Sequence, residues 1–246
     1  MGTLDGKVVV VTGASKGMGS HFVDALVAAG ARVACFARAS PELDAVVARH
    51  GDKTAAFPCD VSRVGEVDAA MAAAVEHFGR LDILVNNAAY QQSKASIAEI
   101  SFEQFDRTMK TNVYAMFHLC KAAIPLMKPG ASIINTGSVN SVSPGEELLD
   151  YATTKGAILI FTKGLAKQLG KQGIRVNMVA PGPVWTPLQV AGGQLPGKMG
   201  EFGQDTPLGR AGQPAELASL FVTLAETGTS FTSGSAFAAT GGSGVL

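Results

Sequence analysis

Short apolar segments alternate with helical patterns along almost the whole chain. The first segment, residues 7–12, contains four consecutive valines. The residues after it show a helical period, because apolar side chains recur there at steps of four, three and four (Met18, Phe22, Ala25 and Ala29). Alternation of this kind predicts a parallel sheet with helices packed on both of its faces.

The pattern predicts an α/β fold built on a single doubly wound parallel sheet, Rossmann-like and of about seven strands. We interpret residues 1–246 as one domain. Strands are expected at residues 7–12, 32–37, 54–58, 81–86, 132–136, 174–179 and 235–239. Helices are expected at residues 18–29, 41–50, 64–78, 102–127, 150–170 and 214–226. Residues 187–213 hold seven Gly and three Pro, which predicts a mobile lid over the substrate.

Charge and cysteine usage exclude several classes of protein. Twenty basic and twenty acidic side chains cancel, so no nucleic-acid partner is expected. The longest apolar run, residues 69–75, is too short to span a membrane, and the first residues show no signal pattern. Cys35, Cys59 and Cys120 lie far apart, which predicts free thiols in a reducing cytoplasm and no metal site. Charged residues are only 16%, which favours surface buried between subunits.

A glycine-rich loop follows the first expected strand. Residues 12–19 read Thr-Gly-Ala-Ser-Lys-Gly-Met-Gly and lead into a helix. Glycines let a backbone approach a pyrophosphate, and the free N–H groups of a helix start bind it. The same letters fit the Gly-x-Ser-x-Gly motif of hydrolases, but only twelve residues precede Gly13 and no His follows His118. We therefore expect a dinucleotide rather than an acyl-enzyme.

The end of the second strand bears on which dinucleotide binds. NAD sites place a carboxylate there for the ribose hydroxyl, whereas this chain has Ala37 followed by Arg38. A guanidinium grips a 2′-phosphate, and Lys16 can add a second positive charge. The sequence favours NADP(H), with NAD(H) as the alternative.

Four polar residues form the expected catalytic group. Tyr151 and Lys155 are four residues apart on one helix, so the phenol and the ammonium share a face. A nearby cation favours a phenolate, and we expect Lys155 and a cationic nicotinamide together to lower the pKa of Tyr151 to about 7, which suits a general acid or base. Ser138 follows the fifth strand and can hydrogen-bond a carbonyl oxygen. Asn112 borders the buried stripe of the long helix.

With these motifs, the whole sequence resembles the short-chain dehydrogenase/reductase family, and in particular its bacterial NADP-type, aldehyde- and sugar-reductase-like subgroup. The resemblance assigns Thr12, Gly13, Gly17 and Gly19 to the cofactor loop, and Asp60 and Val61 to the adenine site. Asn86-Asn87-Ala88-Ala89 matches a family motif that usually ends in Gly, and residues 181–186 match the nicotinamide-binding segment. The residues expected to bind the cofactor are Thr12, Gly13, Ser15, Lys16, Gly17, Met18, Gly19, Arg38, Asp60, Val61, Asn87, Ala88, Ala89, Tyr151, Lys155, Pro181, Gly182, Val184 and Thr186.

The resemblance implies hydride transfer between NADP(H) and a small carbonyl or alcohol. Tyr151 would be the general acid or base, Ser138 would orient the oxygen, and Lys155 would tune Tyr151 and hold the ribose. Asn112 would hold a water that links Lys155 to solvent. The resemblance also implies a homotetramer or a homodimer. A non-catalytic NADP(H)-binding regulator on the same fold is the alternative. We expect the substrate wall in Trp185, Tyr90, Gln91, Gln92 and residues 143–150, besides the lid.

Overall fold

One parallel sheet organises the molecule. The structure is a computed structural model that describes residues 2–195 and 197–243. Its sheet has seven strands in the order β3-β2-β1-β4-β5-β6-β7, and every neighbouring pair is parallel. The strands are β1 (Val8–Thr12), β2 (Arg32–Ala37), β3 (Thr54–Pro58), β4 (Ile83–Asn86), β5 (Ser132–Thr136), β6 (Arg175–Pro181) and β7 (Ala236–Ala239). The prediction of a doubly wound sheet of about seven strands is confirmed.

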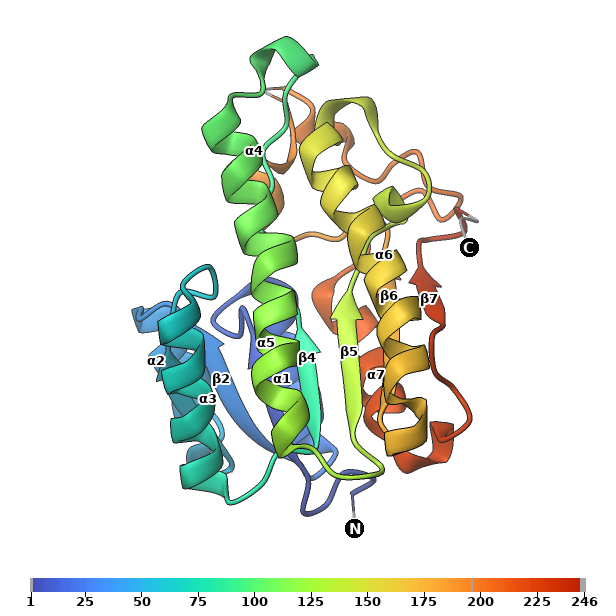
Figure 1. Cartoon of the computed structure of the whole chain (residues 1–246). Helices are drawn as coiled ribbons and strands as arrows, with labels where there is room; N and C mark the ends of the chain where they lie inside the picture. The colour runs from blue at the N-terminus through green and yellow to red at the C-terminus, as the bar shows by residue number, and fades with distance from the viewer. Residues whose placement is uncertain (1, 196, 244–246) are drawn as a thin grey trace.

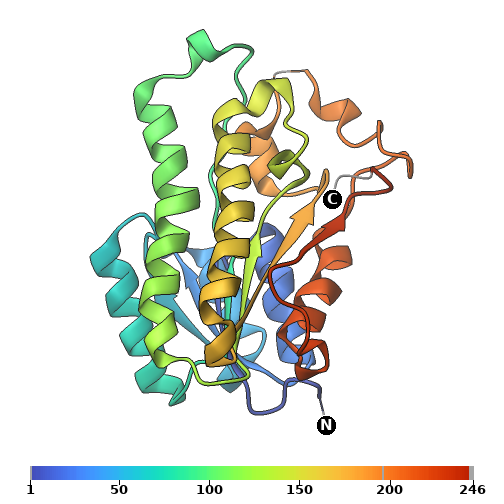
Figure 2. The same cartoon turned by 45° about the vertical axis from the view of Figure 1, so that its right-hand side comes forward.

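Helices cover both faces of this sheet (Figures 1 and 2). They are α1 (Gly17–Ala28), α2 (Pro41–Ala48), α3 (Val64–Phe78), α4 (Phe102–Met109), α5 (Ala115–Ala123), α6 (Leu149–Leu169) and α7 (Pro214–Ala225). One core joins the sheet to α3, α5 and α6, and the other joins it to α1, α2 and α7. Within the second core the rings of Phe22 and Phe221 stack with centroids 3.8 Å apart.

The valine run of β1 shows why this strand lies at the centre. Val8 and Val10 point into one core, while Val9 and Val11 point into the other. Successive side chains of a strand point to opposite faces, so a strand with two covered faces needs an apolar residue at every position. The strand order reverses between β1 and β4, and in such folds the ligand cleft opens at that point, beyond the carboxyl ends of the strands.

The long helix expected at residues 102–127 is interrupted. A π turn, Lys110–Tyr114, separates α4 from α5, and a 3₁₀ turn, Ile124–Leu126, ends the segment. A π turn adds one residue to a helical turn, and such turns are frequent at functional sites. The expectation of one regular helix is therefore wrong at its middle, and Asn112 lies inside the interruption.

Residues 187–213 leave the sheet and return to it. They contain a π turn, Gln189–Gly193, and a 3₁₀ turn, Met199–Glu201. A bridge between Val184 and Gly212 closes the base of the excursion. Throughout the described residues, no helix is both long and apolar enough to cross a bilayer.

Candidate active site

A cleft of about 1790 Å³ lies at the carboxyl ends of the strands. Its walls come from the loops that follow β1 to β6 and from residues 186–206. Eighteen of the twenty-one predicted site residues line it: Gly13, Ser15, Lys16, Gly17, Met18, Arg38, Asp60, Val61, Asn87, Ala88, Ala89, Ser138, Tyr151, Lys155, Pro181, Gly182, Val184 and Thr186. Thr12, Gly19 and Asn112 do not line the cleft but contact residues that do.

The glycine loop turns sharply onto the start of α1. Gly13 and Gly17 have φ angles of 65° and 59°, a region that other residues rarely adopt. A Cβ atom on Gly19 would overlap the carbonyl oxygen of Gly13, so Gly19 serves close packing of helix against loop. The Lys16 side chain does not cap this helix, and its first residues, Gly17 and Met18, line the cleft. The N–H groups of a first helical turn without a cap are suited to bind an anion.

Thr12 joins the first loop to the loop after β4. Its buried hydroxyl accepts hydrogen bonds from the backbone N–H groups of Asn87 and Ala88, at 2.9 and 3.0 Å. The Asn87 amide returns a bond of 3.0 Å to the Thr12 carbonyl. Thr12 therefore holds two cleft walls together rather than forming part of the surface.

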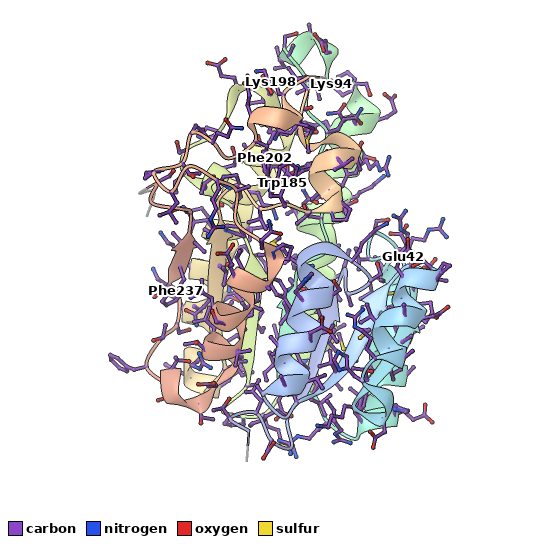
Figure 3. The ribbon with its side chains drawn as sticks, turned by 180° about the vertical axis from the view of Figure 1, so that it is seen from behind. Glu42, Lys94, Trp185, Lys198, Phe202 and Phe237 are labelled. Carbon is purple, nitrogen blue, oxygen red and sulfur yellow. The ribbon has the colours of Figure 1, made fainter. Side chains whose placement is uncertain are left out.

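The end of the cleft beyond β2 is rich in cations. Lys16 and Arg38 both line it and are both exposed. Burial alone would raise the pKa of Asp60, but hydrogen bonds from Ser62 and the charge of Arg38 hold that pKa below its ordinary value. Glu42, the first carboxylate after β2, is exposed at the start of α2 and does not line the cleft (Figure 3).

Ser138, Tyr151 and Lys155 meet on one wall. Ser138 lies directly after β5, and its hydroxyl accepts hydrogen bonds from the backbone and the amide of Asn140, at 3.2 and 3.3 Å. Tyr151 and Lys155 belong to the first two turns of α6. The Lys155 Nζ lies 5.2 Å from the centroid of the Tyr151 ring and donates a bond of 2.7 Å to the Thr136 carbonyl. All three side chains are buried.

Burial dominates the protonation of this wall. It raises the pKa of Tyr151 to about 12, although the neighbouring Ser138 hydroxyl acts in the opposite direction. It also lowers the pKa of Lys155 to about 7. The expected pKa near 7 depends on Lys155 together with a cationic nicotinamide and stays a prediction, whereas burial by itself acts in the opposite direction because it penalises the phenolate. Tyr151 is a neutral proton donor at physiological pH.

Both the oxygen and the nitrogen of the Asn112 side-chain amide form hydrogen bonds with other residues. Its Oδ1 accepts from the Tyr90 backbone N–H at 2.8 Å, and its Nδ2 donates to the Tyr90 carbonyl at 2.9 Å and to Thr154 Oγ1 at 3.0 Å. This buried side chain lines a separate cavity of about 10 Å³, which Lys155 and Thr136 also line. Asn112 thus links the loop after β4 to α6.

Residues from 186–195 and 197–206 contribute a further wall of the cleft. The Gln91 amide donates to Gln189 Oε1 at 3.1 Å, and the Ser93 backbone N–H donates to the Gly192 carbonyl at 2.6 Å. An ion pair joins Lys198 to Glu147 further out. Gln189, Gln194 and Lys198 line the cleft and belong to the predicted segment 187–213, whereas Asn140 lines it and was not predicted. The individual contact between Gln91 and Gln189 was not predicted, since these residues are 98 positions apart.

The expectation that Trp185 lines the substrate wall is wrong. Its ring meets the Phe202 ring edge-on, with centroids 5.3 Å apart (Figure 3), and is 38% exposed. Tyr90, Gln91 and Gln92 do line the cleft, as do residues 145–148 of the expected loop. No three described His, Cys, Asp or Glu side chains gather as metal ligands would.

The chain is similar to known proteins over almost its whole length. Residues 13–243 match the family model described as enoyl-(acyl carrier protein) reductase. The NADPH-dependent aldehyde reductase 1 of Arabidopsis thaliana is 41% identical over 90% of this chain and 80% of its own length. A short-chain dehydrogenase of Burkholderia cenocepacia in complex with NADP has a TM-score of 0.90, 30% identity and 98% coverage of both chains. A 3-ketoacyl-(acyl-carrier-protein) reductase of Brucella melitensis complexed with NADH has a TM-score of 0.91 and 31% identity, covering 97% of this chain and 98% of its own.

Proposed function

Because the chain belongs to the short-chain dehydrogenase/reductase family of oxidoreductases, we propose that it reduces a small aldehyde or ketone with NADPH and catalyses the reverse oxidation. The observation that carries the proposal is the shared wall of Ser138, Tyr151 and Lys155. These three side chains line the same cleft as the glycine loop and residues 181–186. A protein that only binds a dinucleotide does not need a buried tyrosine beside a buried lysine there.

The residues present fit a dinucleotide. The start of α1 and the turn at Gly13 and Gly17 would hold the pyrophosphate, and Asp60 with Val61 would flank the adenine. When bound, the nicotinamide supplies or accepts the hydride. The positive end of the cleft, with Lys16 and Arg38, suits a 2′-phosphate. The NADPH-dependent relative and the NADP-bound neighbour support NADP(H), and the NADH-bound neighbour keeps NAD(H) as the alternative.

Each catalytic side chain has a separate task in this proposal. Ser138 donates a hydrogen bond to the substrate oxygen and fixes its place. Tyr151, whose pKa of about 12 keeps the phenol protonated, gives its proton to that oxygen as negative charge develops there. Lys155, whose pKa of about 7 leaves a protonated fraction at neutral pH, stabilises in that form the phenolate that remains. Asn112 keeps α6 and the Tyr90 loop in register, and we propose that it also holds a water linking Lys155 to solvent.

Cofactor oxidation by a panel of carbonyl compounds tests the function. Aldehydes, ketones, sugars and steroids are offered with NADPH and with NADH. Consumption of the cofactor is followed by the absorbance of the reduced nicotinamide. We expect turnover with NADPH and at least one aldehyde or ketone. Tyr151→Phe should reduce kcat by about 10³-fold or more and leave NADPH affinity within about twofold. Tight NADPH binding without turnover on any compound would favour the regulatory alternative.

We also propose that the single domain assembles as a homotetramer or a homodimer. Large apolar side chains remain exposed on the helices that cover one face of the sheet, among them Phe117 at 47% and Ile160 at 68%. Light scattering coupled to size-exclusion chromatography measures the mass directly. A mass of one chain at micromolar concentration would contradict the assembly and leave the proposed reaction standing.

A further inference from the structure

Asp150 immediately precedes the proposed general acid and is almost fully buried, at 1% exposure. Within the described residues no Lys, Arg or His forms an ion pair with it. It does not line the cleft, so any effect on the reaction would act through its neighbours. A buried carboxylate requires compensating hydrogen bonds, and three neutral donors supply them.

The first donor belongs to the start of α6. Leu148 occupies the N-cap position of this 21-residue helix, and its apolar side chain cannot accept a hydrogen bond from the first N–H groups. Asp150 Oδ1 accepts the Tyr151 backbone N–H at 2.8 Å. A carboxylate in the first helical turn is also favoured by the positive end of the helix dipole. Asp150 thereby fixes the backbone from which the Tyr151 side chain projects.

The other two donors come from α4, which runs beside α6 (Figure 1). Asp150 Oδ2 lies 2.7 Å from Thr108 Oγ1 and accepts from Gln104 Nε2 at 3.1 Å. The same Gln104 amide donates to the Gln92 carbonyl at 3.2 Å. Gln92 lines the substrate side of the cleft. One carboxylate therefore connects the start of α6, the helix α4 and the substrate wall.

We propose that Asp150 is a positioning residue, which holds the Tyr151 phenol in line with Ser138 and with the substrate wall. The inference rests on the proposed function for its catalytic half only. Its structural half, that Asp150 holds the start of α6 against α4, can be measured without turnover. Misplacement of a catalytic group by about 1 Å can cost about 10²-fold in rate, so loss of this contact should appear in kcat.

Asp150→Ala and Asp150→Asn test both halves together. Asparagine keeps an acceptor for the Tyr151 N–H, whereas alanine removes all three acceptor contacts. We expect Asp150→Ala to lower kcat by about 10–100-fold, with the dissociation constant of NADPH within about twofold of wild type, and Asp150→Asn to recover most of the loss. Amide hydrogen exchange in a peptide covering residues 149–155 should accelerate in Asp150→Ala and much less in Asp150→Asn.

Asp82→Ala is the matched control. Asp82 is also a buried aspartate, but it lies before β4 at the opposite end of the sheet, where it accepts the Val8 N–H at 2.9 Å. This control should lower thermal stability and leave kcat and exchange in residues 149–155 unchanged. If Asp150→Ala does not fold, Thr108→Val removes the single hydroxyl on α4 and should give a smaller effect of the same kind.

Two results would overturn the proposal. One is unchanged exchange at residues 149–155 in Asp150→Ala, which would show that the start of α6 needs no support. The other is accelerated exchange with wild-type kcat. An inactive wild-type enzyme would instead contradict the proposed function, while the exchange data would still decide the structural half.

Discussion

At the scale of single residues, the site consists of side chains that act and side chains that hold them. Tyr151 and Ser138 line the cleft, whereas Asn112 and Thr12 form hydrogen bonds with backbone groups of the loop after β4. That loop bears Ala88 and Ala89, which line the cleft. Replacing a holding residue should therefore disturb several contacts at once.

Arg38 offers the sharpest test of cofactor preference. Its guanidinium is exposed at the positive end of the cleft and makes no described ion pair. Arg38→Ala should raise the KM for NADPH by about 10–100-fold and change the KM for NADH by less than about threefold, because only NADPH has a phosphate for this group. Steady-state kinetics with both cofactors measure the ratio. An equal effect on the two cofactors would exclude a 2′-phosphate contact.

At the scale of elements, local patterns predicted most of the fold. The valine run of β1 and the period of α3 arise from burial against neighbouring layers, so these elements could be predicted to within two residues. The π turn at residues 110–114 could not, since the apolar stripe continues through it. Its buried residue, Asn112, bonds to Tyr90 and Thr154, which are 22 and 42 residues away. No local period encodes such contacts.

The site divides in the same way. Residues that follow strands were found because the topology sends every loop of this edge to one cleft. The Gln91–Gln189 contact was missed because it joins two loops that are far apart in the sequence. Trp185 was misplaced because local patterns did not predict that its ring packs against Phe202. The burial that raises the pKa of Tyr151 could not be predicted, because sequence spacing gives the neighbouring charge but not the degree of burial.

A substitution at Gly193 tests whether the Gln91–Gln189 hydrogen bond contributes to substrate binding. A Cβ atom there would overlap both Gln91 Nε2 and Gln189 Oε1, so Gly193→Ala must separate that pair. We expect the KM of the carbonyl substrate to rise about tenfold and the NADPH dissociation constant to stay within about twofold. Gly200→Ala, in the same excursion, is the control, because nothing lies within 4 Å of the added methyl group. Equal KM values for the two variants would show that this contact has no part in substrate binding.

At the scale of the whole molecule, the two ends of the sheet differ in whether a buried charged side chain has an ion-pair partner. At the amino end Asp82 is paired with Arg80, at 2.6 Å, and with Lys7, at 3.5 Å. At the carboxyl end Lys155 is equally buried, yet among the described residues no carboxylate pairs with it, and the Thr136 carbonyl is its acceptor. A desolvated ammonium of this kind lowers the free energy of unfolding. The catalytic wall is thus a site of reduced stability in an otherwise well-packed fold.

The pH dependence of stability follows from that imbalance. The pKa of Lys155 is about 7 in the folded chain, against 10.5 ordinarily, so above pH 7 the unfolded chain binds a proton that the folded chain has released. The free energy of unfolding should rise with pH there, by on the order of 1 kcal/mol per pH unit. The three thiols, whose pKa burial raises to about 12, act in the opposite direction above their ordinary value of 9, so the useful window is pH 7 to 8.5.

Lys155→Met isolates this contribution, because methionine fills much of the same volume without a charge. Urea unfolding at several values between pH 7 and 8.5 should show wild-type stability that climbs with pH and a variant whose curve is flatter by the contribution of one proton. The variant should also be more stable than wild type at pH 7, where the buried ammonium still lowers wild-type stability, and much less active. Parallel curves for the two proteins would mean that Lys155 keeps its ordinary pKa in the fold, and the cleft would then have to be wet enough to solvate it.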